Sequence, residues 1–146
     1  MPMENEGALD LSADISPVGW YVGSYLLRFV ERDEAGNDDA GTRFLVWENT
    51  VIVRATDLEE AFRKVEAVGR AQTRPYLGGE HAAPVQWIFE GITDLLPIYE
   101  PLEDGAEIMW EEHESVELGE LRRRSMSLES IRERFKRDES GVERPL

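Results

Sequence analysis

The chain has 146 residues, with 31 Asp and Glu against 16 Lys and Arg, a net charge of −15 and no cysteine. This length suits a domain whose core is stable without disulfides or metal. The negative charge disfavours binding to nucleic acids and anionic membranes, because both repel it. The lack of cysteine excludes disulfides, thiolate metal sites and a cysteine nucleophile.

Charge divides the chain into three zones, which we take as its domain organisation. Residues 1–17 carry four acids and no base, so we expect an acidic flexible segment. Residues 18–118 carry 21 acids, 8 bases and all four Trp, and we expect a single α+β domain there. Residues 119–146 carry 6 acids and 8 bases and form a basic tail. With no signal peptide at the N-terminus and no apolar span, we expect a cytoplasmic protein.

The first two predicted elements are strands. Residues 19–30 are β-branched and aromatic, and both alternating faces are apolar, which predicts a central strand or one covered on both sides. Residues 43–54 are predicted to be its antiparallel partner after an acidic loop of about ten residues. In this second strand the apolar residues share one parity: Leu45, Trp47, Val51 and Val53.

An amphipathic helix is predicted next, over residues 57–72. Thr56 and Glu59 have the spacing of a capping box, in which each side chain accepts a backbone N–H at the helix start. The apolar residues recur at helical spacing and should form one stripe on the sheet: Leu58, Ala61, Phe62, Val65 and Val68.

Two further strands complete the predicted sheet. Residues 85–95 alternate, with Val85, Trp87 and Phe89 on one face and Gln86, Ile88, Glu90 and Ile92 on the other. Asp104-Gly105 predicts a turn into a fourth strand over residues 106–112. The predicted order is β-β-α-β-β.

The predicted fold is therefore α+β: a four-stranded, mainly antiparallel sheet with one packed helix and a C-terminal amphipathic helix. Ser127 is the expected cap of that last helix, which covers residues 127–135. Because the first strand is apolar on both faces, we expect the tail helix or a second subunit to cover the second face. Homodimerisation is thus a secondary prediction.

Four segments together resemble a bacterial domain-of-unknown-function family, number 4288. They are residues 19–22, 48–61, 85–92 and 97–107. The most specific element is the strand from Trp87 to Gly91 followed by the Leu-Glu-Asp-Gly-Ala-Glu turn at 102–107. The resemblance covers about residues 19–112 and supports the domain limits and the α+β architecture. The family brings no known activity, so the resemblance implies no catalytic residue.

Catalytic and metal sites find little support in the sequence. His113 stands among Glu111, Glu112 and Glu114, but in a strand only Glu111 shares its face, and two ligands do not make a metal site. Glu48 and Glu90 each interrupt an apolar strand beside a Trp, and we expect them to pair with Arg28, Arg43 or Arg54 across the strands. We predict no cofactor, no metal and no catalytic residue.

Exposed acidic residues, with aromatic residues near them, are the candidate partner-binding surface. The acids fall in two groups: Glu31, Asp33, Glu34, Asp38 and Asp39 in the first loop, and Glu100, Glu103, Asp104, Glu107, Glu111, Glu112 and Glu114 after the third strand. The candidate aromatic anchors are Trp47, Tyr99 and Trp110. Clustered acids either serve solubility or steer a basic protein partner.

These observations lead to one preferred hypothesis and two alternatives. The preferred one is a small protein-binding module, an immunity protein that neutralises a basic bacterial toxin by direct binding. In the second, ordered carboxylates mimic DNA and inhibit a nucleic-acid-binding protein. The third is an enzyme that uses Glu48 or Glu90.

Overall fold

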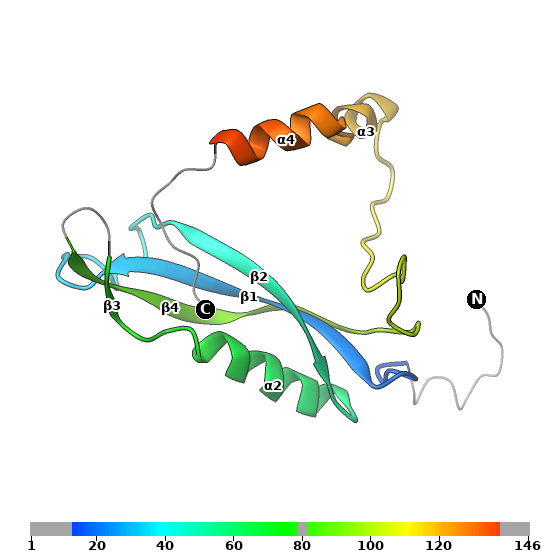
Figure 1. Cartoon of the computed structure of the whole chain (residues 1–146), viewed down its shortest axis with the longest axis horizontal. Helices are drawn as coiled ribbons and strands as arrows, with labels where there is room; N and C mark the ends of the chain where they lie inside the picture. The colour runs from blue at the N-terminus through cyan, green and yellow to red at the C-terminus, as the bar shows by residue number, and fades with distance from the viewer. Residues whose placement is uncertain (1–12, 79–81, 138–146) are drawn as a thin grey trace. The chain divides into compact units, whose positions relative to one another are not determined.

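The computed structural model describes residues 13–78 and 82–137, and it forms two compact units, the first ending at Met109 and the second beginning at Trp110 (Figure 1). The elements of the first unit are β1 (Trp20–Glu31), β2 (Val46–Arg54), α2 (Leu58–Arg70), β3 (Tyr76–Gly78) and β4 (Ala83–Pro97). Its four strands form one antiparallel sheet in the order β2-β1-β4-β3, and α2 packs on the central strands. The predicted α+β class is confirmed.

The fourth strand of the sheet differs from the prediction. Residues 106–112 form neither helix nor strand, and the fourth place belongs to the three-residue β3, which pairs with the start of β4. The turn before residue 106 does form, because Ala106 N–H donates to Glu103 O at 2.9 Å and Gly105 has φ +86°. A turn alone does not make a hairpin, since the chain after it must also find a free strand edge.

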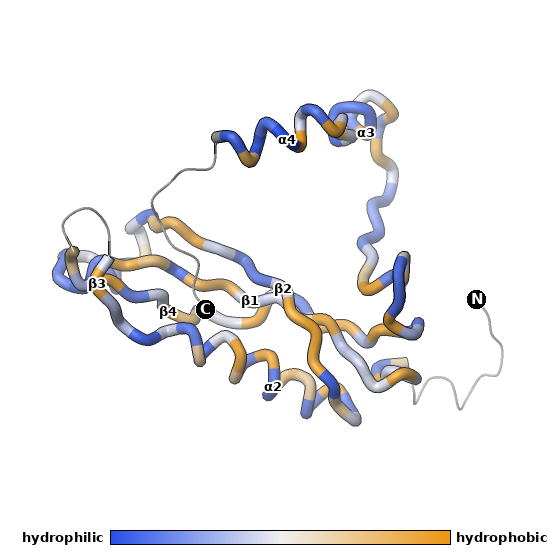
Figure 2. The backbone as a smooth tube through the Cα atoms, in the orientation of Figure 1, coloured by the Kyte–Doolittle hydropathy of each residue, from blue (hydrophilic) through white to orange (hydrophobic). Residues whose placement is uncertain are grey.

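β1 is the central strand and carries most of the core. Tyr21, Tyr25 and Leu27 are fully buried on the face that α2 covers, together with Trp87 of β4. Trp47 of β2 lies against Trp87, with ring centroids 5.0 Å apart. Hydrophobic residues run along β1 and β4, while α2 alternates between hydrophobic and hydrophilic residues (Figure 2). Residues 19–30, whose two apolar faces predicted a central strand, thus correspond to a central strand of the sheet, β1.

Two bulges interrupt β4. Its pairing with β1 shifts twice, so that Glu90 and Thr93 have no opposite residue. The shift moves Ile92 opposite Tyr25, onto the same face as Phe89, whereas simple alternation had put it on the face of Ile88. The bulge beside Gly91 uses a φ of +144°, which favours glycine.

α2 begins one residue later than the predicted capping box. Asp57 is the cap: its side chain accepts the N–H of Glu60 at 2.8 Å. The Glu60 carboxylate accepts the N–H and the hydroxyl of Thr56, at 2.7 and 2.9 Å. These bonds, led by the backbone N–H, hold the pKa of Glu60 below its ordinary value. Asp57 and Glu60 thus take the places predicted for Thr56 and Glu59, but the Glu60 carboxylate accepts from Thr56, one residue before the cap.

The buried stripe of α2 is narrower than predicted. Ala61, Val65 and Gly69 are buried on the sheet, whereas Phe62 is 45% exposed at the side of the helix. Gly69 permits a close approach, because a Cβ there would lie 2.6 Å from a ring carbon of Phe89. The helix therefore packs closely against β4 at Gly69, and the Phe62 side chain stays partly exposed at the side of the helix.

The second unit contains α3 (Leu118–Arg124) and α4 (Leu128–Arg137). Ser127 caps α4 as predicted, since its Oγ accepts the N–H of Ser130 at 3.0 Å. α3 was not predicted; Glu120 pairs there with Arg123 at 2.8 Å and with Arg124 at 3.1 Å. Within residues 13–78 and 82–137, none of the helices has the length and apolar content needed to cross a membrane.

Candidate functional site

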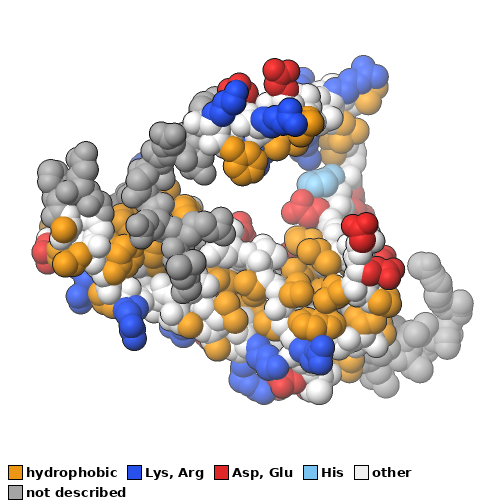
Figure 3. All heavy atoms as spheres, viewed as in Figure 1, with side chains coloured by type: hydrophobic (Ala, Val, Ile, Leu, Met, Phe, Trp, Pro, Cys, Tyr) orange, Lys and Arg blue, Asp and Glu red, His pale blue; other side chains and the backbone are white. Residues whose placement is uncertain are grey.

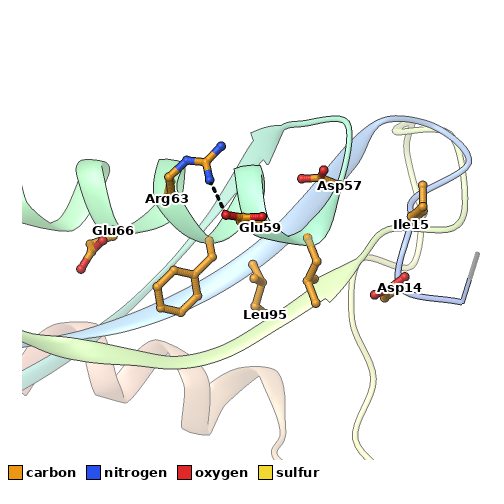
Figure 4. A pocket seen from close by; sticks show the side chains of 9 residues that line it. Asp14, Ile15, Asp57, Glu59, Arg63, Glu66 and Leu95 are labelled. Atoms are coloured by element: carbon orange, nitrogen blue, oxygen red, sulfur yellow. Dashed lines mark ion pairs between the residues drawn. The ribbon is translucent and has the colours of Figure 1, made fainter.

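A groove of about 700 Å³ lies along the start of α2 and is the candidate site (Figure 4). Its lining residues come from three segments: Asp14 and Ile15 before β1, Asp57, Leu58, Glu59, Phe62, Arg63 and Glu66 at α2, and Leu95 of β4. We call it the α2 groove. In Figure 4 the Leu95 side chain extends from β4 toward α2, and Ile15 lies on the loop beside the helix start.

The α2 groove is apolar in its floor and acidic around it. The floor consists of Ile15, Leu58, Phe62 and Leu95, of which Ile15 is 40% and Phe62 45% exposed. Exposed large side chains gathered in one concavity are typical of a binding surface, whereas single exposed ones are ordinary. In the space-filling view, hydrophobic side chains reach the surface of the first unit and charged ones border them (Figure 3).

The rim of the α2 groove has a negative balance. Four carboxylates and one guanidinium line it. Glu59 pairs with Arg63 at 3.0 Å, and Glu66 pairs with Arg70 at 3.3 Å, but both pairs are exposed and contribute little to stability. Asp57 serves as the helix cap. The rim is therefore suited to positive groups that flank an apolar segment.

Ser16 fixes one wall of the α2 groove. This buried side chain donates to Ile98 O at 2.5 Å and accepts the N–H groups of Val18 and Trp20, at 3.2 and 3.1 Å. The Ser16 N–H donates to the hydroxyl of Tyr21 at 3.0 Å. These bonds tie the segment before β1 to the end of β4, which holds Asp14 and Ile15 beside α2.

Tyr99 adds a second tie between the same segments. Its hydroxyl donates to Ala13 O. Burial raises the pKa of Tyr99 above its ordinary value, and the nearby Asp14 carboxylate raises it further. The role predicted for Tyr99 as an interface anchor stays a prediction, and its bond to Ala13 helps to hold the segment that brings Asp14 and Ile15 to the α2 groove.

The predicted acids of the first loop are exposed. Glu31, Asp33, Glu34, Asp38 and Asp39 lie in the acidic loop, which we define as residues 31–42. Arg28 holds this loop: its Nε lies 2.6 Å from Glu90, its NH1 donates to Asn37 O at 2.7 Å, and its guanidinium lies over the ring of Phe44. A hollow of about 320 Å³ there is lined by Asp38, Asp39 and Glu90, among others.

The second group of predicted acids is divided between the two compact units. Glu100, Glu103, Asp104 and Glu107 are exposed in the first unit, while Trp110, Glu111, Glu112 and Glu114 are exposed in the second. Glu111 meets His113 at 3.3 Å, although this segment is not the strand from which their shared face was argued. In the described part of the chain, no three His, Asp or Glu side chains are placed to hold a metal ion.

Glu48 and Glu90 have different partners. Glu90 pairs with Arg28, as predicted. Glu48 accepts the hydroxyl of Thr93 at 2.5 Å, so it bonds to Thr93 where an arginine was predicted. The loop hollow is lined by Glu90 and not by Glu48.

Trp47 lies in a different environment from the other predicted anchors. Its ring packs against the buried Trp87, so it forms the margin of the core. Sequence reasoning missed Ile15, Phe62 and Leu95 as site residues. The sequence held one signal for them, in α2. Its five apolar positions are too many to be buried together in a narrow stripe on a sheet, so some of them must stay exposed.

The match to protein families settles which family the chain represents. Residues 20–110 match the family described as "Domain of unknown function (DUF4288)". The chain belongs to this family. The match covers all the strands and α2 of this DUF4288 protein, while Asp14 and Ile15 lie outside it. Neither the curated proteins nor the solved structures gave a match.

Proposed function

We propose that this DUF4288 protein is a cytoplasmic protein-binding module that takes an apolar segment of a basic protein into the α2 groove. The observation that carries the proposal is the apolar floor of Ile15, Leu58, Phe62 and Leu95 inside an acidic rim. In its most specific form, the partner is a bacterial toxin and the chain is its immunity protein. The proposal assigns no catalytic step to the chain.

The floor of the α2 groove would supply affinity. Phe62 and Ile15 are large, nearly half exposed and held in place by α2 and the Ser16 bonds. Burial of such side chains contributes about 25 cal/mol for each Å² of apolar surface removed from water. Because α2 already orders Phe62 and the Ser16 bonds already order the segment of Ile15, binding requires little further ordering, which favours affinity.

The net charge of −15 would select basic partners and raise the rate of association with them. The acidic loop and the acids of residues 100–107 are exposed in the same unit as the α2 groove. Complementary fields accelerate the encounter with a basic partner and reject acidic ones, and salt weakens both effects. A DNA mimic needs carboxylates at phosphate spacing but no apolar floor, so the α2 groove favours a protein ligand.

Affinity capture from the native host at low and high salt tests the proposal. The wild-type chain should retain a basic protein at low salt, and retention should fall at high salt. Phe62→Ala should lower the retained amount about tenfold or more, because a central aromatic anchor commonly contributes at least 2 kcal/mol.

Leu77→Ala is the matched control, since Leu77 is 69% exposed on β3 and lies outside the α2 groove. Its variant should retain the partner as the wild type does. Equal retention by the Phe62 variant, or capture of acidic proteins alone, would refute the proposed contact surface. Displacement of the captured protein by duplex DNA would support the DNA-mimic alternative.

A further inference from the structure

The outer edge of β2 is a regular strand edge (Figure 1). β2 pairs with β1 in one unbroken register over its nine residues and lies at the end of the sheet. Two bonds reveal which backbone groups face β1: Phe29 N–H donates to Leu45 O, and Ala55 N–H donates to Gly19 O. Because bonded and non-bonded pairs alternate in an antiparallel ladder, the backbone groups of the even-numbered residues from Val46 to Arg54 point outward.

These outward groups are accessible. The even-numbered residues of β2 are all exposed: Val46, Glu48, Thr50, Ile52 and Arg54. Among the described residues, one of their outward backbone groups has a partner, the carbonyl of Arg54, which accepts from Lys64 Nζ at 2.6 Å. The remaining N–H and C=O groups form a row of the kind to which another strand pairs.

The other long edge in this molecule is protected against such pairing. β4 beyond residue 85 also lacks an outer neighbour among the described residues, but it carries the bulges at Glu90 and Thr93. In addition, the Asp94 side chain accepts the N–H of Leu95 at 2.9 Å, so this backbone donor of β4 already has a partner. Bulges and inserted charges are the usual protection of an edge, and the continuous register of β2 contains no bulge.

The side chains of β2 indicate what pairs with it. If a second β2 lies antiparallel with Asn49 opposite Asn49, Val46 falls opposite Ile52, Trp47 opposite Val51 and Glu48 opposite Thr50. Apolar residues then meet apolar ones and polar residues meet polar ones. A register centred on Thr50 instead places Val46 opposite Arg54 and Glu48 opposite Ile52. Of these two registers, only the one centred on Asn49 pairs apolar residues with apolar ones and polar residues with polar ones. It also keeps the existing bond from Lys64 to the Arg54 carbonyl.

We propose that a second copy of this chain pairs with the β2 edge, antiparallel and in the Asn49 register, so that two sheets join into one. A twofold axis beside Asn49 relates the copies, and the same edge serves both, as in an isologous dimer. Each copy carries a charge of −15, so the copies repel at low salt. Dimerisation should therefore strengthen with salt, whereas binding of a basic partner should weaken, and the two proposals can fail independently.

Sedimentation velocity across concentration and salt tests the dimer. Val46→Lys or Ile52→Glu alone should weaken dimerisation about tenfold, because each change replaces an apolar pair twice across the twofold axis. The double variant should regain dimerisation, since Lys then faces Glu in the Asn49 register. In the Thr50 register the same double variant would place like charges opposite each other, so rescue identifies the register.

Disulfide cross-linking gives a second measurement. Because the sequence contains no cysteine, an introduced cysteine has no other thiol in the chain to react with. Asn49→Cys should form a disulfide-linked dimer on mild oxidation, because a directly opposed non-bonded pair has the short Cα separation that a disulfide needs. Thr50→Cys is the control and should cross-link more slowly. A chain that stays monomeric at all salt concentrations, or faster cross-linking at Thr50, would overturn the proposal. Unchanged circular dichroism of each variant confirms that it folds.

Discussion

Ser16 and Ser24 offer a matched test of how the α2 groove is held together. The two serines are equally buried, at 7% and 6% exposure. The hydroxyl of Ser16 makes three bonds to backbone groups, at Ile98 O and at the N–H groups of Val18 and Trp20. The hydroxyl of Ser24 makes one bond, to Thr50 Oγ1, whose residue is exposed. The same change to alanine therefore removes very different interactions.

The expected cost follows from what each change leaves behind. Ser16→Ala leaves a carbonyl and two N–H groups without their partner in a buried site, which costs about 1–3 kcal/mol. Ser24→Ala leaves a hydroxyl that can turn to water, and about 0.5–1 kcal/mol is expected. Loss of about 2 kcal/mol would lower the urea midpoint by about 1 M for a protein of this size.

Urea unfolding followed by tryptophan fluorescence measures both variants. Capture of the partner should also weaken for Ser16→Ala, because Asp14 and Ile15 lose their tie to β4, whereas Ser24→Ala should keep full capture. A Ser24 variant that is destabilised as much as the Ser16 variant would show that the backbone ties do not hold this wall. The reasoning about the α2 groove would then be wrong.

Two further predictions concern α2. Gly69→Ala should destabilise the protein by about 1–2 kcal/mol in urea unfolding, because the new Cβ would lie 2.6 Å from Phe89. Gly119→Ala should be neutral or stabilising, because the new Cβ would meet the end of the Arg123 side chain at an ordinary contact distance of 3.6 Å. For Glu60, the pKa in the folded state lies below the ordinary 4.5, so its stabilisation is present above that pH and is lost as the pH falls through the folded value. Glu60→Gln should therefore flatten the fall in the urea midpoint between neutral pH and about pH 3, and an unchanged slope would contradict the bonds to Thr56.

Local patterns predicted the elements whose signals are local. The apolar faces of residues 19–30 mark the central β1, and the stripe of α2 marks the helix on the sheet. The predicted fourth strand failed because alternation at residues 106–112 cannot show whether a free edge is within reach. The strand that does pair there, β3, has three residues and gives almost no pattern.

The candidate site was predicted only in part for the same physical reason. The exposed acids of the acidic loop are visible as charge in the sequence. The α2 groove depends on the bond from Ser16 to Ile98, which joins residues 82 positions apart. The bulges at Glu90 and Thr93 also depend on pairing with β1, although Gly91 marked a place where the backbone could bend. Such long-range contacts leave no periodic signal in the chain.

The most direct test of the proposed function is the dissociation constant of the captured protein, measured against salt for the wild type and for Phe62→Ala. The account predicts a basic protein whose dissociation constant rises with salt for both chains and is about tenfold higher for the Phe62 variant at every salt concentration. The same affinity for both chains, or affinity that does not depend on salt, would contradict an apolar groove with an acidic rim as the binding surface.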